Sequence, residues 1–378
     1  MPAPASPIRA SQFRTCLLSD TVVTLHSNGE RPTIDSPSFS SDDPSMSSLA
    51  DPIDWTILER LRSEFLNAQG DVGVYWKNET DLAHYHRFFA ARIGWKWDDA
   101  IEQACQVGWQ RQANRIFDWG CGTGIATMRM LDAFGSDGIE EVVLWDHSTL
   151  ACSFARETIA NAHPGLPIRV ADPETIDSLD NTLCLASHVL NELDADSRSR
   201  LLRAFSAARQ VFWVEPGSFD SSRLLGEARE ALIDRFAPIA PCTCDAGCPM
   251  TLAENDRHWC HFFAKTPVEA FTQTDWSRFA AIMEIDLRSL PYSFLCLDNR
   301  AIANSKALAD ASRVIGRPRQ HKGYSRVLSC DASGLNDYEL QKRDCKALWK
   351  KIKKGKDGSL YEWGRIDSGR IQSGEALP

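Results

Sequence analysis

The fold of this 378-residue chain depends on one stretch, Arg115-Ile116-Phe117-Asp118-Trp119-Gly120-Cys121-Gly122-Thr123-Gly124-Ile125-Ala126-Thr127. Ile116 and Phe117 favour a short buried strand that ends in an acid, Asp118. Three alternate glycines follow, and they remove the side chains that would obstruct a sharp turn. We therefore predict a strand, a glycine-rich turn that lets backbone approach a ligand closely, and the beginning of a helix.

The spacing of these glycines excludes two common nucleotide-binding motifs. A dinucleotide fingerprint has two residues between its second and third glycines, and the third position is Ile125 here. The lysine of a phosphate-binding loop is also missing. The alternative to a ligand-binding turn is an ordinary tight turn between a strand and a helix. The sequence around the glycines is needed to choose between the two.

Further apolar runs with the character of buried strands follow the turn. They cover residues 141–146, 167–170, 182–186 and 210–215. Helix-like segments at 150–162 and 194–208 alternate with them. This order predicts a parallel sheet with helices on both faces.

Polar side chains stand where the predicted strands end, and ligands of such sheets bind at the carboxyl ends of the strands. Asp146 would lie beside the first turn, close enough to accept hydrogen bonds from both ribose hydroxyls of a nucleoside. We predict a cofactor site that consists of Asp118, Gly120, Gly122, Gly124, Asp146, Asp172 and Ser187.

The glycine turn resembles motif I of the class I S-adenosylmethionine-dependent methyltransferases, which reads Asp-x-Gly-x-Gly-x-Gly. In that family the glycines admit the methionine end of the cofactor. The resemblance implies an α/β fold with a Rossmann-like seven-stranded sheet and S-adenosylmethionine as cofactor. Strands at 292–297 and 324–330 would form the antiparallel hairpin that closes the sheet.

Composition and charge limit the possible partners. The chain has 43% hydrophobic and 25% charged residues, as globular proteins do, and no window approaches the roughly 18 to 20 apolar residues of a membrane span. Its formal net charge of −9 argues against a protein that is basic throughout, although a local basic face is compatible with it. We expect that the protein has no membrane partner and that it is a monomer.

The chain divides into four parts. Residues 1–50 are rich in Ser, Pro and Asp and are predicted to be disordered. Residues 51–112 form a helical cap with many aromatic residues, which we interpret as core packing rather than stacking on RNA bases. Residues 113–335 form the methyltransferase-like domain, and 336–378 a basic carboxyl-terminal tail.

A Cys-rich insertion at 240–263 interrupts that domain. Cys242, Cys244, Cys248 and Cys260 lie within 19 positions, among Pro and Gly. Clustered cysteines in a chain without an evident secretory signal are metal ligands or buried thiols more often than they are disulfides, and the Pro and Gly around these four favour metal ligands. Zinc and iron-sulfur clusters both accept four thiolates, so the spacing leaves both open.

Basic residues gather near the carboxyl end and are the expected phosphate contacts. The alternative is a solvated helix face with a flexible tail. The residues are Arg313, Arg317, Arg319, His321, Lys322 and Arg326, followed by Lys342, Arg343, Lys346, Lys350, Lys351, Lys353, Lys354 and Lys356.

Several blocks in the same order resemble the methyltransferase-like assembly proteins of the small ribosomal subunit, a family of mitochondria and bacteria. Besides the glycine turn they are 186–193, 214–217, 241–249, 259–262 and 319–330. The resemblance covers roughly residues 70 to 335. It implies a four-iron four-sulfur (4Fe-4S) cluster on Cys242, Cys248, Cys260 and Cys330. Cys244 has no counterpart, because the family's loop carries a histidine near that position.

The resemblance also implies a partner, the small ribosomal subunit with its rRNA, in the bacterial cytoplasm or the mitochondrial matrix. Two functions fit it. One is an S-adenosylmethionine-dependent rRNA methyltransferase, and the other is a non-catalytic assembly and RNA-binding factor that retains the cofactor pocket. No catalytic motif is recognisable; His188 is a candidate substrate contact, whereas Cys184 lies inside a predicted strand. The basic surface disfavours a third function, a zinc-stabilised methyltransferase of small molecules.

Overall fold

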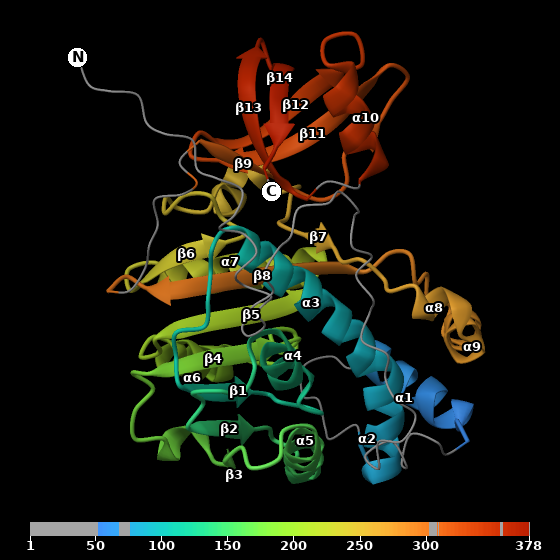
Figure 1. The fold of residues 1–378 in the computed structure, drawn as a ribbon, viewed down its shortest axis with the longest axis vertical. Coiled ribbons are helices and arrows are strands. Elements are labelled where there is room, and N and C mark those ends of the chain that lie inside the picture. The colour runs from blue at the N-terminus through green and yellow to red at the C-terminus, as the bar shows by residue number, and fades with distance from the viewer. Residues whose placement is uncertain (1–51, 68–75, 302–307, 309, 356–357, 378) are drawn as a thin grey trace, which may run out of the picture.

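The computed structural model describes residues 52–67, 76–301, 308, 310–355 and 358–377. Residues 1–50, for which we predict disorder, lie outside these ranges. Two β-sheets organise the described chain, a large open sheet with a smaller barrel above it in Figure 1. None of the helices in the described ranges combines the length and the apolar character needed to cross a bilayer.

The large sheet is mostly parallel. Its main strands are β1 (Arg115–Trp119), β2 (Glu141–Trp145), β3 (Ile168–Val170), β4 (Thr182–Ser187), β5 (Gln210–Pro216), β6 (Phe236–Ala240) and β8 (Pro291–Asn299). They are ordered β3-β2-β1-β4-β5-β8-β6, and the short β7 (Phe262–Phe263) pairs with β8. Strands β1 to β5 run parallel, whereas β8 is antiparallel to β5 and to β6. The predicted class I methyltransferase sheet is confirmed.

One strand of that prediction is wrong. The strand predicted at 292–297 is β8, but its partner at the edge is β6, and residues 324–330 belong to the barrel. Pro238 lies within β6, and a proline indicates a turn rather than a central strand because it has no N–H to donate. At the edge of the sheet that N–H is not needed.

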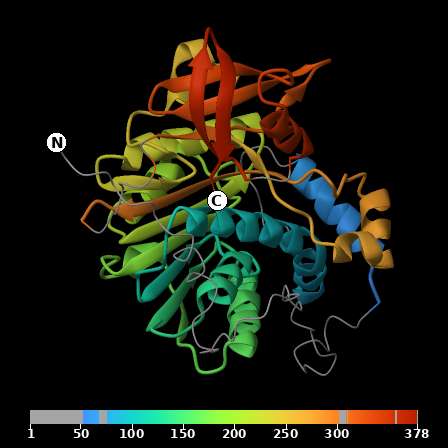
Figure 2. The same cartoon turned by 45° about the horizontal axis from the view of Figure 1, so that its top comes forward.

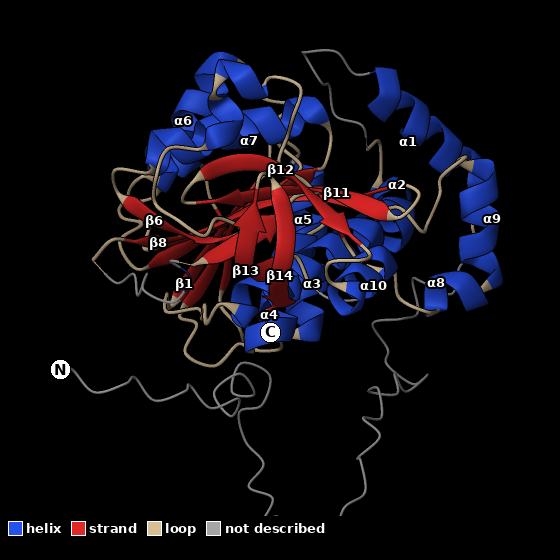
Figure 3. Cartoon of the chain, turned by 90° about the horizontal axis from the view of Figure 1, so that it is seen from above, coloured by secondary structure: helices blue, strands red, loops and turns tan. Residues whose placement is uncertain are grey.

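Helices cover both faces of the large sheet, as predicted. They are α3 (Ala91–Gln106), α4 (Ile125–Phe134), α5 (Thr149–Ala162), α6 (Ala195–Phe205) and α7 (Phe219–Leu232). Figure 3 shows α6 and α7 on one side of the strands and α3 and α4 on the other. Side chains alternate along a strand, so Ile116 packs into the core with α3 and α4, and Phe117 packs into the core with α6 and α7.

The helical cap begins with α1 (Trp55–Asn67). Helix α2 (Glu79–Tyr85) continues through the π-helical segment η2 (His86–Ala90) into α3. Figures 1 and 2 show this cap beside α8 (Glu269–Thr272) and α9 (Thr274–Ile282). Phe88 stacks on Phe279 with ring centroids 4.9 Å apart, and Trp97 is fully buried. These rings pack in the core, which agrees with our interpretation of the aromatic residues of the cap. Another aromatic residue of this part of the chain, Tyr75, lies outside the described residues.

The carboxyl-terminal region is a closed barrel and not a tail. It contains β9 (Ala311–Val314), β10 (Arg319–Gln320), β11 (Tyr324–Asp331), β12 (Gly334–Gln341), α10 (Lys346–Lys354), β13 (Leu360–Asp367) and β14 (Arg370–Ala376). The strands pair in the order β9-β11-β12-β14-β13, and β13 returns to β9. Only β12 and β14 are parallel, and the helix lies between the third and fourth barrel strands. This topology is that of an OB-fold.

A buried hydrogen-bond network attaches the cap to the large sheet. The side-chain oxygen of Gln210 in β5 accepts hydrogen bonds from the backbone N–H groups of Gln112 and Ala113 at 2.6 and 3.1 Å. Its side-chain nitrogen donates to Asp298 Oδ1 in β8 at 2.8 Å, and the indole of Trp109 donates to the same oxygen at 2.8 Å. Gln210 is therefore the central residue of this junction.

We expect Gln210→Ala to destabilise the protein by about 2 to 4 kcal/mol, because it leaves the buried N–H of Ala113 and the N–H of Gln112 without this acceptor and Asp298 with one donor fewer. Chemical denaturation followed by circular dichroism measures the change. The exposed Gln273, whose side chain makes no capping hydrogen bond, offers a matched control in Gln273→Ala. Equal losses in the two variants would contradict the role of Gln210.

Candidate functional site

The glycine turn joins the end of β1 to the start of α4. Gly120, Gly122 and Gly124 have φ angles of +69°, +51° and +80°, a region that other residues rarely adopt. A Cβ atom on Gly120 would lie 2.6 Å from Cγ1 of Val189, so packing alone requires that glycine. A Cβ on Gly122 would meet nothing nearer than a ring carbon of Trp76 at 3.9 Å. Gly122 is thus the glycine with space beside it.

Asp146, just past the end of β2, lies directly against this turn. Its Oδ2 accepts a hydrogen bond from the backbone N–H of Gly122 at 3.0 Å, and its Oδ1 accepts one from Ser148 N–H at 2.9 Å. The parallel register pairs Trp119 of β1 with Trp145 of β2, so both strands end at the same level. The tertiary structure therefore brings together an acid and a glycine that are 24 positions apart in sequence.

Asp118 is fully buried beneath the turn. Its Oδ2 accepts a hydrogen bond at 2.7 Å from the hydroxyl of Thr127 in the first turns of α4, and Oδ1 has no hydrogen-bond partner among the described residues. Burial raises the pKa of this carboxyl to about 7. Asp118 thus links the end of the strand to the helix that follows the glycines.

The end of β4 is held by helix α3. Trp97 donates from its indole nitrogen to Oγ of Ser187 at 2.9 Å. The preceding residue, Lys96, places Nζ 3.3 Å from Nε2 of His188. His188 has a φ of +58°, which is uncommon for a residue with a side chain. Ser187 and His188 are therefore positioned by the cap as well as by the sheet.

Burial alters the proton affinity of this pair. The pKa of Lys96 falls to about 7 because the amine is buried and because Arg92 lies nearby. Burial, together with the charges of Lys96 and Arg92, keeps the pKa of His188 well below its ordinary value. Sequence reasoning missed Lys96, because a single lysine in a helix carries no motif. Its position between Trp95 and Trp97 was the one available signal.

Glu215, near the end of β5, fixes the loop that follows β4. Its Oε1 accepts hydrogen bonds from the N–H groups of Val189 and Leu190 at 3.1 and 3.2 Å and from the indole of Trp213 at 2.6 Å. Burial raises the pKa of Glu215 to about 7, and Oε2 lacks a partner within the described ranges. The residue therefore fixes the loop that directly follows Ser187 and His188.

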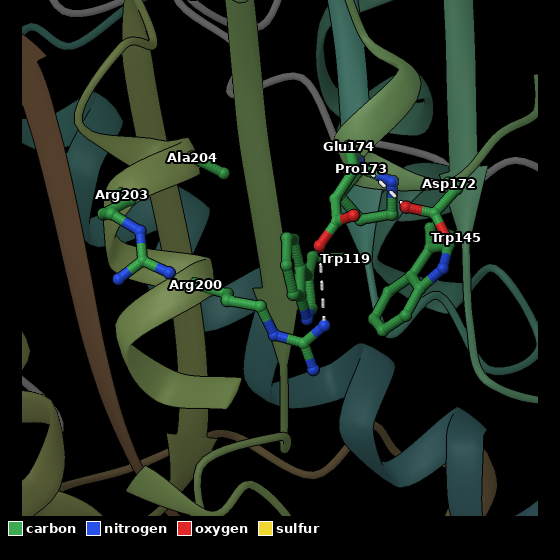
Figure 4. Close-up of a pocket in the computed structure, with 8 residues that line it drawn as sticks. All are labelled: Trp119, Trp145, Asp172, Pro173, Glu174, Arg200, Arg203 and Ala204. Carbon is green, nitrogen blue, oxygen red and sulfur yellow. Dashed lines mark hydrogen bonds and ion pairs between the residues drawn. The ribbon is translucent and has the colours of Figure 1, made fainter. Parts of the chain in front are cut away.

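A cavity of about 230 Å³ opens beyond the ends of β1, β2 and β3 (Figure 4). Trp119 and Trp145 contribute aromatic walls, and Asp172 lines it together with the short 3-10 helix η3 (Pro173–Thr175). Oδ1 of Asp172 accepts a hydrogen bond from Glu174 N–H at 2.9 Å. Asp172 thus lies at this cavity, whereas Asp118 and Asp146 adjoin the glycine turn.

The cysteines expected to bind metal come from separate segments. Cys242 follows β6, Cys248 precedes the 3-10 helix η4 (Pro249–Thr251), Cys260 precedes β7, and Cys330 lies in β11 of the barrel. Figure 1 shows the insertion, in yellow, between the large sheet and the barrel. Cys248, Cys260 and Cys330 pack against the same apolar core. The insertion and the barrel therefore meet at these thiols.

Their electrostatic interactions show that these thiols lie near one another. Burial raises the pKa of Cys260, and negative charge on Cys242, Cys248 and Cys330 raises it further. Nε of Arg229 lies 3.3 Å from Sγ of Cys242. Within the described ranges, however, no three His, Cys, Asp or Glu side chains are arranged as ligands of a single metal ion.

We expect Lys96→Met to change the pH dependence of stability. The pKa of Lys96 is about 7 in the folded protein and near its ordinary 10.5 when unfolded, so the unfolded chain binds more protons between these values. Lys96 therefore destabilises the fold fully below about pH 7, and this penalty disappears as the pH rises toward 10.5.

Thermal unfolding at about pH 6 and about pH 9 measures the effect. Lys96→Met should raise the melting temperature more at the lower pH, whereas Lys77→Met, at an exposed position, should change it little at either pH. A gain of equal size at both pH values would contradict a buried, titrating Lys96.

Comparisons with solved structures concern the fold. The chain is similar to the plantazolicin methyltransferase BamL in complex with S-adenosylhomocysteine (9% identity, 66% of this chain and 100% of that one, TM-score 0.36). It is also similar to the mitomycin 7-O-methyltransferase MmcR (15% identity, 68% of this chain and 70% of that one, TM-score 0.33). A third similar structure is that of an S-adenosylmethionine-dependent methyltransferase of Leishmania major (12% identity, 65% of this chain and 82% of that one, TM-score 0.33).

The search among curated proteins found no match. A family model, described as mitochondrial small ribosomal subunit Rsm22, matches residues 99–365, which is more than half of the chain. The match extends from helix α3 through the large sheet and the Cys-rich insertion into β13 of the barrel. This chain therefore belongs to the Rsm22 family.

Proposed function

We propose that this protein is an S-adenosylmethionine-dependent methyltransferase-like factor that acts on the small ribosomal subunit and methylates its rRNA. One observation carries the cofactor assignment: Asp146 Oδ2 lies 3.0 Å from the N–H of Gly122, at the ends of two parallel strands. The family supports the partner, since its description names the mitochondrial small ribosomal subunit. That description also favours the mitochondrial matrix over the bacterial cytoplasm.

The residues present fit such a cofactor. Gly122 leaves room for a ligand beside the turn, and the carboxylate of Asp146 can accept hydrogen bonds from ribose hydroxyls. The cavity lined by Trp119, Trp145 and Asp172 offers aromatic surface and a carboxylate, which suit a nucleobase with an exocyclic amine. S-adenosylmethionine, when bound, supplies an electrophilic methyl group on its sulfonium sulfur.

The chain itself contributes positioning, exclusion of water and a proton acceptor. Trp76 lies over Gly122, so the cap covers the turn. Lys96, which lies against His188 beside the loop that Glu215 anchors and has a pKa of about 7, can take up a proton from a nucleophile near neutral pH. Correct orientation alone can contribute about 7 to 11 kcal/mol in such reactions.

The alternative is an assembly factor that binds the cofactor without transferring methyl groups. The arrangement of His188 favours it, because this candidate substrate contact is already engaged by Lys96. Both functions require the cofactor to bind, and only the first requires methylated rRNA as product. Incubation of the protein with small-subunit rRNA and radiolabelled cofactor distinguishes them.

We expect Asp146→Asn to weaken the binding of S-adenosylmethionine by about tenfold or more, because a charged acceptor is worth roughly 1.5 to 3 kcal/mol. Isothermal titration calorimetry measures the affinity. Asp132→Asn, a matched change at an exposed position in α4, should bind like the wild type. Unaltered affinity in Asp146→Asn would refute the assignment of the cofactor site.

We further propose that Cys242, Cys248, Cys260 and Cys330 hold a 4Fe-4S cluster. Its four irons bind one thiolate each, so these thiolates lie farther apart than those around a single zinc ion. The charge interactions of Cys260 with Cys242, Cys248 and Cys330 support binding of one group by these four residues. Arg229 beside Cys242 supplies positive charge next to the thiolates. Such a cluster would join the insertion to β11 of the barrel.

Anaerobically purified protein is expected to be brown, and Cys248→Ser should lose the broad visible absorbance and most of the bound iron. Cys152→Ser is the control, since Cys152 lies in α5, outside this cluster, and should keep both. Ultraviolet-visible spectra and iron analysis provide the measurement. Stoichiometric zinc without iron in the wild type would refute the iron-sulfur cluster.

A further inference from the structure

An open groove of about 720 Å³ lies at one end of the barrel, away from the glycine turn. One side of the groove is formed by Lys322, between β10 and β11, and by Tyr324, the first residue of β11. The other side runs from the end of β12 to the start of α10 and consists of Gln341, Lys342, Arg343 and Lys346. The backbone N–H of Lys342 donates to the carbonyl of Gly323 at 3.0 Å, so both sides of the groove are held at a fixed distance.

The groove carries uncompensated positive charge. Lys322, Lys342 and Lys346 are exposed, and none of them has an acidic partner within 4.0 Å in the described part of the chain. The neighbouring arginines differ, because Arg319 and Arg326 both form ion pairs with Asp337, at 2.5 and 3.1 Å. The lysines, rather than these paired arginines, are therefore available to an anionic ligand.

One of the basic residues expected to contact phosphate does not face solvent at all. Arg313 is buried in β9 and donates hydrogen bonds to the carbonyl of Pro241 at 2.8 Å and to Gln103 Oε1 at 3.2 Å. That expectation is wrong for Arg313. Its basic side chain satisfies buried oxygen atoms where cap, insertion and barrel meet.

A flat aromatic surface adjoins the lysines. The rings of His321 and Tyr324 stack with centroids 4.6 Å apart and an angle of 10° between their planes. His321 is exposed and Tyr324 is half-buried at the start of β11. Nucleobases stack on such rings, and a groove that combines stacking rings with lysines is typical of proteins that bind single strands.

The groove also has the position at which OB-folds bind oligonucleotides. In that fold the ligand contacts the second and third strands and the loops that follow the first and fourth strands. Here those strands are β11 and β12, and the first of the loops contains His321 and Lys322. The turn after β13 is adjacent, since Gly369 accepts a hydrogen bond from Glu339 N–H at 2.9 Å. Leu328, Cys330 and Leu335 pack on the core of the large sheet, which leaves this end of β11 and β12 open.

We propose that this groove is a binding site for single-stranded RNA, with Lys322, Lys342 and Lys346 on the phosphates and the His321–Tyr324 pair beneath a base. The aromatic pair favours a nucleic acid over an acidic protein, because carboxylates gain nothing from a stacking surface. It favours a single strand over a duplex, whose bases are already stacked. The site is separate from the cofactor turn, so it does not require methyl transfer.

Fluorescence anisotropy of a labelled 12-nucleotide oligouridylate with the full chain, without S-adenosylmethionine, tests the proposal. Lys322→Glu combined with Lys346→Glu should weaken binding and flatten its salt dependence by about 1.4 in the logarithmic slope, since single strands lose about 0.7 per phosphate contact. Tyr324→Ala should weaken binding by about fivefold or more. Lys350→Glu combined with Lys354→Glu makes the same charge change on α10 outside the groove and should have a smaller effect.

Three results would overturn the proposal: equal losses in the two lysine pairs, equal affinity for the same sequence in a duplex, or equally tight binding of polyglutamate. Melting curves show whether each variant is folded, and Tyr324→Phe separates loss of the ring from loss of fold because it should bind as the wild type does. Cofactor titration of Lys322→Glu combined with Lys346→Glu should give wild-type affinity. Failure of the groove and failure of the cofactor site are thereby distinguishable.

Discussion

The parallel pairing of β1 with β2 is the constraint on which the candidate site depends. It aligns Trp119 with Trp145, so the glycine turn after one strand and Asp146 after the other meet at one edge of the sheet. The hydrogen bond from Gly122 to Asp146 follows from this alignment. Ile116 and Phe117 of β1 and Val142, Val143 and Leu144 of β2 are buried. A shift in register would therefore expose core residues and would also displace Asp146 from the turn.

A second junction relates the cofactor domain to the barrel. Arg313 extends from β9 to Pro241 at the start of the insertion, to Gln103 in α3 and to Ser359 before β13. Burial lowers the pKa of its guanidinium to about 10, and the hydrogen bonds that Nε and Nη1 donate offset part of the cost of burying this charge. The proposed cluster on Cys242, Cys248, Cys260 and Cys330 would reinforce this same junction.

The two proposed sites have different physical requirements. The cofactor site needs a rigid turn, a buried acid and a cap that excludes water, and each of these is built from packed elements. The groove on the barrel needs exposed lysines and an accessible ring, which tolerate solvent and lie on loops. A factor that holds RNA on the barrel could present a nucleotide to the large sheet, or could remain bound without chemistry. The same architecture therefore accommodates both functions.

The sequence alone determined most of the large sheet, because strands β1 to β5 and β8 are local apolar runs, but it did not predict β6 as the edge strand. It also predicted the glycine turn with Asp146 beside it, and it singled out the cysteine blocks as candidate metal ligands, because these are local patterns. It did not determine what depends on distant contacts. Lys96 became part of the site only when α3 packed across β4, and the basic tail became a barrel only when β13 returned to β9. A charge pattern cannot distinguish a buried Arg313 from an exposed Lys322, since burial is decided by partners far away along the chain.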